Sequence, residues 1–272
     1  MGLPQELIDY IMHMLSGDFG ALEASSLTCK SMFASARPLI HETLRMTPQN
    51  NERTLTREEK EGLLRKLGHH EFRLLSYMGE RGLLQYTRHV DITISTPSSL
   101  LPHIHYFRSL DRVHTITIRS YNTVNWTSHC RAYFVHFYPT LTSLTLIRPF
   151  GSYRALMEFA MQFPNLENLC IENLRGGWNR DPTTVAINRF PPLCGHLRLV
   201  GYKTTAEWPG SADPTHGLPD GFNFRSVELE DYPDRCIQQL LRSCAHTLVN
   251  LTIVPPDVGA YHTSFPLLSI ID

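Results

Sequence analysis

The residues with the most evident capacity for chemistry are the 14 histidines and six cysteines of this 272-residue chain. Their closest groupings, which could in principle hold a zinc ion, are His69-His70, His103-x-His105, and Cys236 with Cys244-x-His246. None of these groupings has the spacing of a recognised zinc site, and Cys244 falls on the apolar face of an expected helix. We therefore predict that the chain holds no metal and no other cofactor.

Catalytic signatures are equally scarce. The sequence has no Gly-rich phosphate loop, no nucleophile elbow and no His-Glu-x-x-His motif. Cys29 and Cys170 lie on apolar patterns, where a buried and inert thiol is the usual outcome. We predict a non-enzymatic protein. The alternative from the enzyme class is a hydrolase that pairs a Cys or Ser with a His far away in the sequence.

Composition limits the partners. Hydrophobic residues make up 42% of the chain, enough for a sizeable core, and the formal net charge is −1. No basic block marks a nucleic-acid interface, and no run of 18 apolar residues marks a membrane span. The N-terminus carries no secretory signal, so reduced thiols in the cytoplasm or nucleus are expected.

The first 44 residues predict three short helices. Leu3-Pro4 opens a helical pattern, because proline is favoured in a first helical turn. The apolar residues that follow share one helical face: Leu7, Ile8, Ile11, Met14 and Leu15. Residues 16–18 end this helix and Asp18 can cap the second, while Thr28 can cap a third that Pro38 interrupts. Such a small module would gain much stability from a partner.

The order of these residues resembles a known motif. Leu-Pro-x-Glu-Leu-Ile-x-x-Ile, followed by Ser-Leu-x-Cys-Lys-x-x-Phe, is similar over residues 3–44 to the F-box, especially its fungal versions. One departure is that residues 30–33 lack the Trp that the family often has in this stretch. The resemblance implies docking on the Skp adaptor subunit of an SCF ubiquitin ligase and, through it, on a cullin.

Docking residues follow from the resemblance by motif position. They are Leu3, Pro4, Leu7, Ile8, Ile11, Leu15, Leu27 and Phe33. Of these, Leu27 and Phe33 would be shared, together with Cys29, between the core of the module and the interface. The alternative is that all these residues form only a small hydrophobic core.

A recurrent unit fills the C-terminal part from about residue 86. Its kernel is apolar-x-apolar, and successive kernels are 24 to 30 residues apart. The copies are Ile92/Ile94, Ile116/Ile118, Leu144/Leu146, Leu169/Ile171, Leu197/Leu199, Val227/Leu229 and Leu251/Ile253. Each kernel predicts a short strand, and helix-like stretches lie between kernels, which is typical of leucine-rich repeats. The region resembles the irregular repeats that commonly follow fungal F-boxes, although the consensus Asn after the strand is mostly missing.

These patterns predict an α/β protein with three parts. A three-helix F-box over residues 1–46 precedes a helical linker over 47–85 and a leucine-rich-repeat-like solenoid over 86–272. The solenoid would carry a parallel sheet on its concave side. Its last segment, Phe265-Pro266-Leu267-Leu268, copies the lead-in to an earlier strand. We expect either a truncated product or an exposed edge that a partner covers.

A target would bind the solenoid. The residues that split each kernel should point outward, and the charged ones among them are Arg198 and Glu228. Trp126, Trp178 and Trp208 fall seven to nine residues after their kernels, so they should lie in loops on one rim and could anchor a partner. The alternative is that each Trp packs beneath its own loop.

The expected function is a substrate-recognition adaptor that docks on Skp and holds an unknown protein target. The alternative within the binding class is a repeat scaffold that works independently of ubiquitin.

Overall fold

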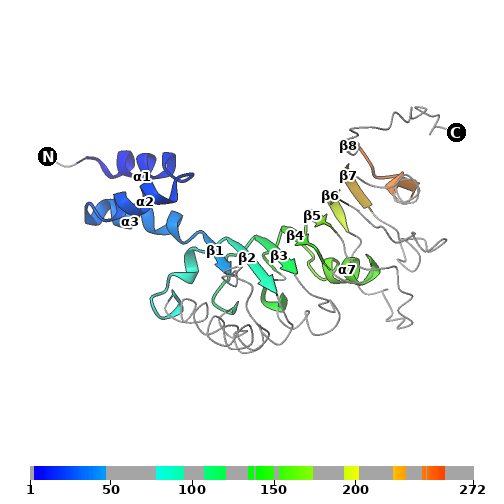
Figure 1. The fold of residues 1–272 in the computed structure, drawn as a ribbon, viewed down its shortest axis with the longest axis horizontal. Coiled ribbons are helices and arrows are strands. Elements are labelled where there is room, and N and C mark those ends of the chain that lie inside the picture. The colour runs from blue at the N-terminus through cyan, green and yellow to red at the C-terminus, as the bar shows by residue number, and fades with distance from the viewer. Residues whose placement is uncertain are drawn as a thin grey trace, which may run out of the picture.

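A computed structural model of the chain describes residues 3–46, 78–94, 107–120, 134–137, 139–149, 153–173, 193–201, 223–230, 241–242 and 244–254. Within these residues the chain is a mixed α/β protein built on an eight-stranded, all-parallel sheet (Figure 1). The strands lie side by side in chain order. They are β1 Thr43–Met46, β2 His89–Ile94, β3 Thr115–Ser120, β4 Ser143–Ile147, β5 Asn168–Glu172, β6 Cys194–Val200, β7 Asn223–Glu230 and β8 Asn250–Val254. The prediction of an α/β class with a parallel sheet is confirmed.

Helices precede the sheet and lie between its strands. They are α1 Gln5–Met14, α2 Phe19–Ser26, α3 Lys30–Ile40, the 3-10 turns η1 Leu84–Tyr86 and η4 Val135–Phe137, and α7 Tyr153–Ala160. In the described part of the chain, none of the helices has the length and apolar character needed to cross a membrane.

Two details of the first three helices differ from the sequence-based expectation. Asp18 caps α2 as predicted, since its Oδ1 accepts a hydrogen bond from the backbone N–H of Ala21 at 3.0 Å. Cys29, and not Thr28, is the N-cap of α3, while the Thr28 hydroxyl donates to the carbonyl of Ser25 at 2.7 Å. The expected interruption at Pro38 is also wrong, because α3 continues to Ile40. Pro38 lies in the last turn of α3, so the backbone donor that it lacks removes one hydrogen bond and only two residues of the helix follow it.

The sheet begins about 40 residues earlier than predicted. β1 pairs with β2 in parallel, with Leu44 beside Val90 and Met46 beside Ile92. β1 therefore lies within residues 1–46, the span that was predicted to hold only the three-helix module. Residues 47–77, which include most of the predicted helical linker, lie outside the described residues.

The junction between α3 and the sheet is short and well bonded. The backbone carbonyl of Glu42 accepts hydrogen bonds from the N–H groups of Arg88 and His89, at 2.9 and 3.0 Å. The guanidinium group of Arg37 on α3 lies 5.7 Å from the ring centroid of Tyr86, within cation–π range. The end of α3 is therefore tied directly to the first two strands.

The register of the sheet corrects one kernel. Val90 and Ile92 lie beside Ile116 and Ile118, so the first kernel is Val90/Ile92 and not Ile92/Ile94. The other six kernels align with one another as predicted. A strand alternates with a period of two, so a run of three alternating apolar residues leaves the choice of pair open until the neighbouring strand is known.

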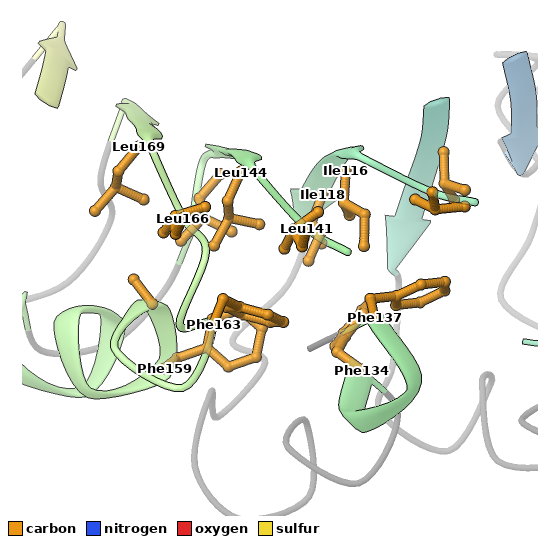
Figure 2. Close-up of a cluster of buried hydrophobic side chains, with 14 of the residues drawn as sticks. Ile116, Ile118, Phe134, Phe137, Leu141, Leu144, Phe159, Phe163, Leu166 and Leu169 are labelled. Carbon is orange, nitrogen blue, oxygen red and sulfur yellow. The ribbon is translucent and has the colours of Figure 1, made fainter. Parts of the chain in front are cut away.

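The buried face of the sheet rests on an aromatic layer. Figure 2 shows the kernel side chains of β3, β4 and β5 pointing toward phenylalanines of the segments below them. Phe134 occupies the centre of this layer, with ring centroids 5.8 Å from Phe159, 6.2 Å from Phe137 and 6.4 Å from Phe107. All four rings are fully buried. The opposite face of the sheet, called the open face below, carries half-exposed polar side chains.

One glycine permits the irregular start of β6. The register with β7 shifts between Gly195 and His196. Gly195 has φ +96°, and a Cβ there would lie 2.2 Å from the backbone oxygen of Glu167. The N–H of His196 donates to the same oxygen at 2.7 Å. Only glycine combines this backbone conformation with such a close approach.

Candidate interaction surfaces

The N-terminal helices share a small core of their own. Its members are Ile8, Met12, Leu22 and Ala36, which are at most 6% exposed. Leu15 is partly buried against this core. Among the predicted docking residues, Ile8 therefore lies inside the module and not on its surface. Its side chain stabilises the packing of α1 on α2 and α3.

A second apolar face of α1 points to solvent. Its residues follow the i, i+3, i+4, i+7 spacing of one helical face and are called the α1 stripe: Leu7 (48% exposed), Tyr10 (62%), Ile11 (38%) and Met14 (69%). A helix that is apolar on two sides is expected where both sides become buried. A contiguous exposed apolar patch of this kind marks an interaction site more often than chance exposure does.

Most of the other predicted docking residues are exposed too. Leu3, Leu27 and Phe33 are 56%, 83% and 50% exposed, and Pro4 is the exposed N-cap of α1. Cys29 is exposed as well. Tyr10 and Met14 were not among the predicted docking residues. Their spacing from Leu7 could have identified both.

The opposite side of α1 is polar. A groove of about 370 Å³ between α1 and α3 is lined by Gln5, Asp9, His13, Ala34, Ser35, Pro38 and Leu39. The hydroxyl of Ser35 and the side-chain amide of Gln5 donate hydrogen bonds to Oδ1 of Asp9, at 2.5 and 2.8 Å. These two bonds lower the pKa of Asp9, with Ser35 the larger cause. The groove joins α1 to α3 through hydrogen bonds, whereas the side chains of the α1 stripe remain 38% to 69% exposed.

The open face carries the residues that split the kernels. From β1 to β8 they form one central row: Arg45, Asp91, Thr117, Thr145, Cys170, Arg198, Glu228 and Thr252. With the predicted kernel Ile92/Ile94, Thr93 would lie in this row. The corrected register of β2 puts Asp91 there instead, and Thr93 lies two residues further along the strand.

Charged side chains on this face form pairs between neighbouring strands. Arg119 contacts both carboxylate oxygens of Asp91, at 3.1 and 3.2 Å. Nε of Arg198 lies 3.2 Å from Oε1 of Glu228, and its Nη2 donates to Oε2 of Glu230 at 3.1 Å. The predicted target-binding residues Arg198 and Glu228 thus contact each other.

Cys170 on β5 has a suppressed thiolate. Burial raises its pKa to about 12, and the nearby carboxylate of Glu172 adds to this rise. The thiol donates a weak hydrogen bond to Oε1 of Glu172 at 3.7 Å. Because the thiolate is the nucleophilic form, Cys170 is poorly suited to act as the nucleophile of a hydrolase.

This suppressed thiolate has a measurable consequence. At pH 8, iodoacetamide should alkylate Cys170 at least about 100-fold more slowly than the exposed Cys29, because both thiolate fraction and access are reduced. The rate at Cys170 should keep rising about tenfold per pH unit beyond pH 9, since its pKa lies far above the ordinary thiol value. Mass spectrometry of each cysteine-containing peptide measures both rates. Glu172→Gln should accelerate the reaction at Cys170, and equal rates for the two cysteines in the folded protein would contradict the assignment.

The remaining predicted site residues are the three tryptophans and the members of the possible metal groupings. Trp126, Trp178 and Trp208 lie outside the described residues, as do His69, His70, His103, His105 and Cys236. Within the described ranges, no group of three or more His, Cys, Asp and Glu side chains is placed to hold a metal ion.

Comparison with known proteins gave no match to any family model, curated protein or solved structure. The two surfaces, the α1 stripe and the open face, therefore have to be interpreted from the chain's own residues.

Proposed function

We propose that the chain is a substrate-recognition adaptor of an SCF-type E3 ubiquitin ligase. In this proposal α1, α2 and α3 form an F-box that binds the Skp subunit. The strands that follow belong to a leucine-rich-repeat-like solenoid that binds a protein target. No side chain of the chain performs chemistry, because the adaptor acts by raising the effective concentration of target lysines near the charged ubiquitin carrier.

The α1 stripe is the observation that carries the proposal. It presents four large apolar side chains on the helix that also carries the Leu-Pro-x-Glu-Leu-Ile motif. Full burial of an exposed side chain of this kind contributes about 1.5–3 kcal/mol. The four side chains are 38% to 69% exposed, so covering the stripe adds roughly half of that amount for each of them. The small core of the module, with four buried residues, adds a reason for a partner, since so few buried groups stabilise a free-standing domain poorly.

The sheet supports the second half of the proposal. Successive strands are parallel, adjacent in space and separated in most cases by 24 to 30 residues, as expected of stacked repeats. Only His41 and Glu42 separate α3 from β1, and Arg37 contacts Tyr86 across this junction. A target on the sheet would therefore be held at a fixed distance from the ligase core.

Reconstitution tests the proposal. The full chain is mixed with purified Skp subunit and cullin and analysed by size-exclusion chromatography with light scattering. Co-elution of all three proteins supports the adaptor function. Binding of Skp without cullin would instead favour the ubiquitin-independent scaffold. A folded chain that does not bind Skp would reject the F-box assignment.

A further inference from the structure

β8 lies at one end of the row of strands, and its kernel is exposed (Figure 1). Leu251 and Ile253 are 42% and 51% exposed, whereas every kernel residue of β1 to β7 is at most 4% exposed. β1 lies at the other end of the row, yet its kernel residues Leu44 and Met46 are buried in one cluster with Leu83. A row of stacked units needs a cover at both ends. In the described part of the chain, only the end at β1 has one.

The free edge of β8 also presents backbone donors. Residues that directly precede a kernel residue donate their N–H groups toward the preceding strand, as Asn168 does to the carbonyl of Thr142 at 3.0 Å. Successive residues of a strand point their N–H groups to alternate sides, so the N–H groups of Leu251 and Ile253 point away from β7. Residues 249–254 contain neither a charged residue nor a proline, two devices that commonly protect an edge strand. This edge is therefore suited to pairing with a further strand.

Two earlier strands, β4 and β5, follow a common lead-in. The first kernel residue of each comes five residues after a proline, Pro139 before β4 and Pro164 before β5. The leucines two residues after these prolines, Leu141 and Leu166, are 0% and 5% exposed. Figure 2 shows both leucines on the side of the sheet that faces the phenylalanines. The lead-in thus places one leucine in the core just before it starts a strand.

The same lead-in recurs at Pro266, in a segment that lies outside the described residues. Leu268 stands two residues after this proline, and Ile271 stands five residues after it. By the spacing of β4 and β5, Ile271 would be the first kernel residue of a further strand. It follows Leu251 by 20 residues, and about 20 residues is the lower limit of the length of a leucine-rich repeat.

We propose that residues 265–272 cover the free edge of β8, with Ile271 beside Leu251 in a parallel pair and Leu268 packed in the core beneath. The segment accepts hydrogen bonds from the outward N–H groups of β8 and shields part of its apolar face. The chain then closes its own row of strands, and β8 is not free to pair with the β8 of a second copy. This inference is independent of Skp binding.

Hydrogen exchange followed by NMR tests the inference on the full chain. In the Leu268→Asp/Ile271→Asp variant, the amides of Leu251 and Ile253 should exchange at least about tenfold faster than in the wild-type chain. The reason is that both N–H groups lose their acceptors when the carboxylates keep the segment out of the core.

Two controls separate this pairing from general loosening of the strand. Leu267→Asp changes the neighbouring leucine, which corresponds to the exposed Asn165 in the lead-in of β5, and it should leave both rates unchanged. The amide of Thr252 points toward β7, so it should respond less to the double substitution than its two neighbours do.

Three outcomes would overturn the inference. The first is that wild type and double variant exchange these two amides at the same rate. The second is an equal acceleration by Leu267→Asp. The third is protection that rises with protein concentration while light scattering shows a dimer, because the edge would then be covered by a second copy. A monomeric wild-type chain with slow exchange at both amides, lost in the double variant alone, supports the inference.

Discussion

Replacing Leu7 and Ile11 together by aspartate is expected to weaken binding of the Skp subunit by more than about 100-fold. Leu7 and Ile11 are 48% and 38% exposed, so covering each of them contributes roughly half of the 1.5–3 kcal/mol of full burial. A change of about 1.4 kcal/mol corresponds to a tenfold change in affinity. Each substitution also introduces a carboxylate that is costly to bury without a partner. Biolayer interferometry on immobilised Skp measures the loss.

The fold should survive this double substitution. Leu7 and Ile11 are 48% and 38% exposed, whereas the core of the module is formed by other residues of α1, such as Met12. Far-UV circular dichroism should therefore be unchanged. The loss of binding can then be assigned to the interface.

The chain offers a matched control for the same chemistry. Leu251 and Ile253 on β8 are 42% and 51% exposed, close to the values of Leu7 and Ile11. Replacing both by aspartate should leave Skp binding intact, because β8 is at the opposite end of the row of strands from α1 (Figure 1). Unimpaired binding by the α1 variant, or an equal loss in the β8 variant, would show that the α1 stripe is not the docking surface.

The N-terminal helices illustrate what a sequence pattern can and cannot establish. The existence of α1 follows from its spacing of apolar residues, and the cap at Asp18 follows from its residue type. The division of α1 into a buried and an exposed face does not follow. Leu7 and Ile8 are adjacent and both apolar, yet one is 48% exposed and the other 6%. Which of them faces inward depends on where α2 and α3 pack, and periodicity alone does not contain that information.

The sheet was predictable wherever its repeat was regular. Six kernels were placed correctly because their spacing of 24 to 30 residues made each one support the next. β1 was missed because its kernel, Leu44/Met46, lies 46 residues before that of β2, outside the range of the other spacings. The contact between Arg198 and Glu228 needs only the register of β6 and β7, so the cross-strand neighbour rule could have predicted it.

Truncating Phe134 to alanine is expected to lower the free energy of unfolding by about 3–5 kcal/mol, as is usual for a buried phenylalanine. Phe134 is fully buried and contacts three other rings, including an edge-on contact with Phe159 at 5.8 Å (Figure 2). Its loss leaves a cavity that lies between successive turns of the chain, and neighbouring strands cannot collapse into it without losing their register. Urea denaturation followed by circular dichroism measures the change.

Phe19→Ala provides the control, because the same atoms are removed from a side chain that is 59% exposed. Its effect should stay within about 0.5–1 kcal/mol, the range of ordinary surface substitutions.

In a row of stacked units each strand is supported mainly by its neighbours, so a cavity beneath β3 and β4 should destabilise strands on both sides of it. Hydrogen exchange should then accelerate in β2 to β5 of the Phe134→Ala variant while α1 to α3 keep their protection. A uniform acceleration that includes these helices would mean that the module and the sheet unfold as one cooperative unit. An unfolding free energy equal to that of Phe19→Ala would mean that the aromatic layer does not hold the strands together.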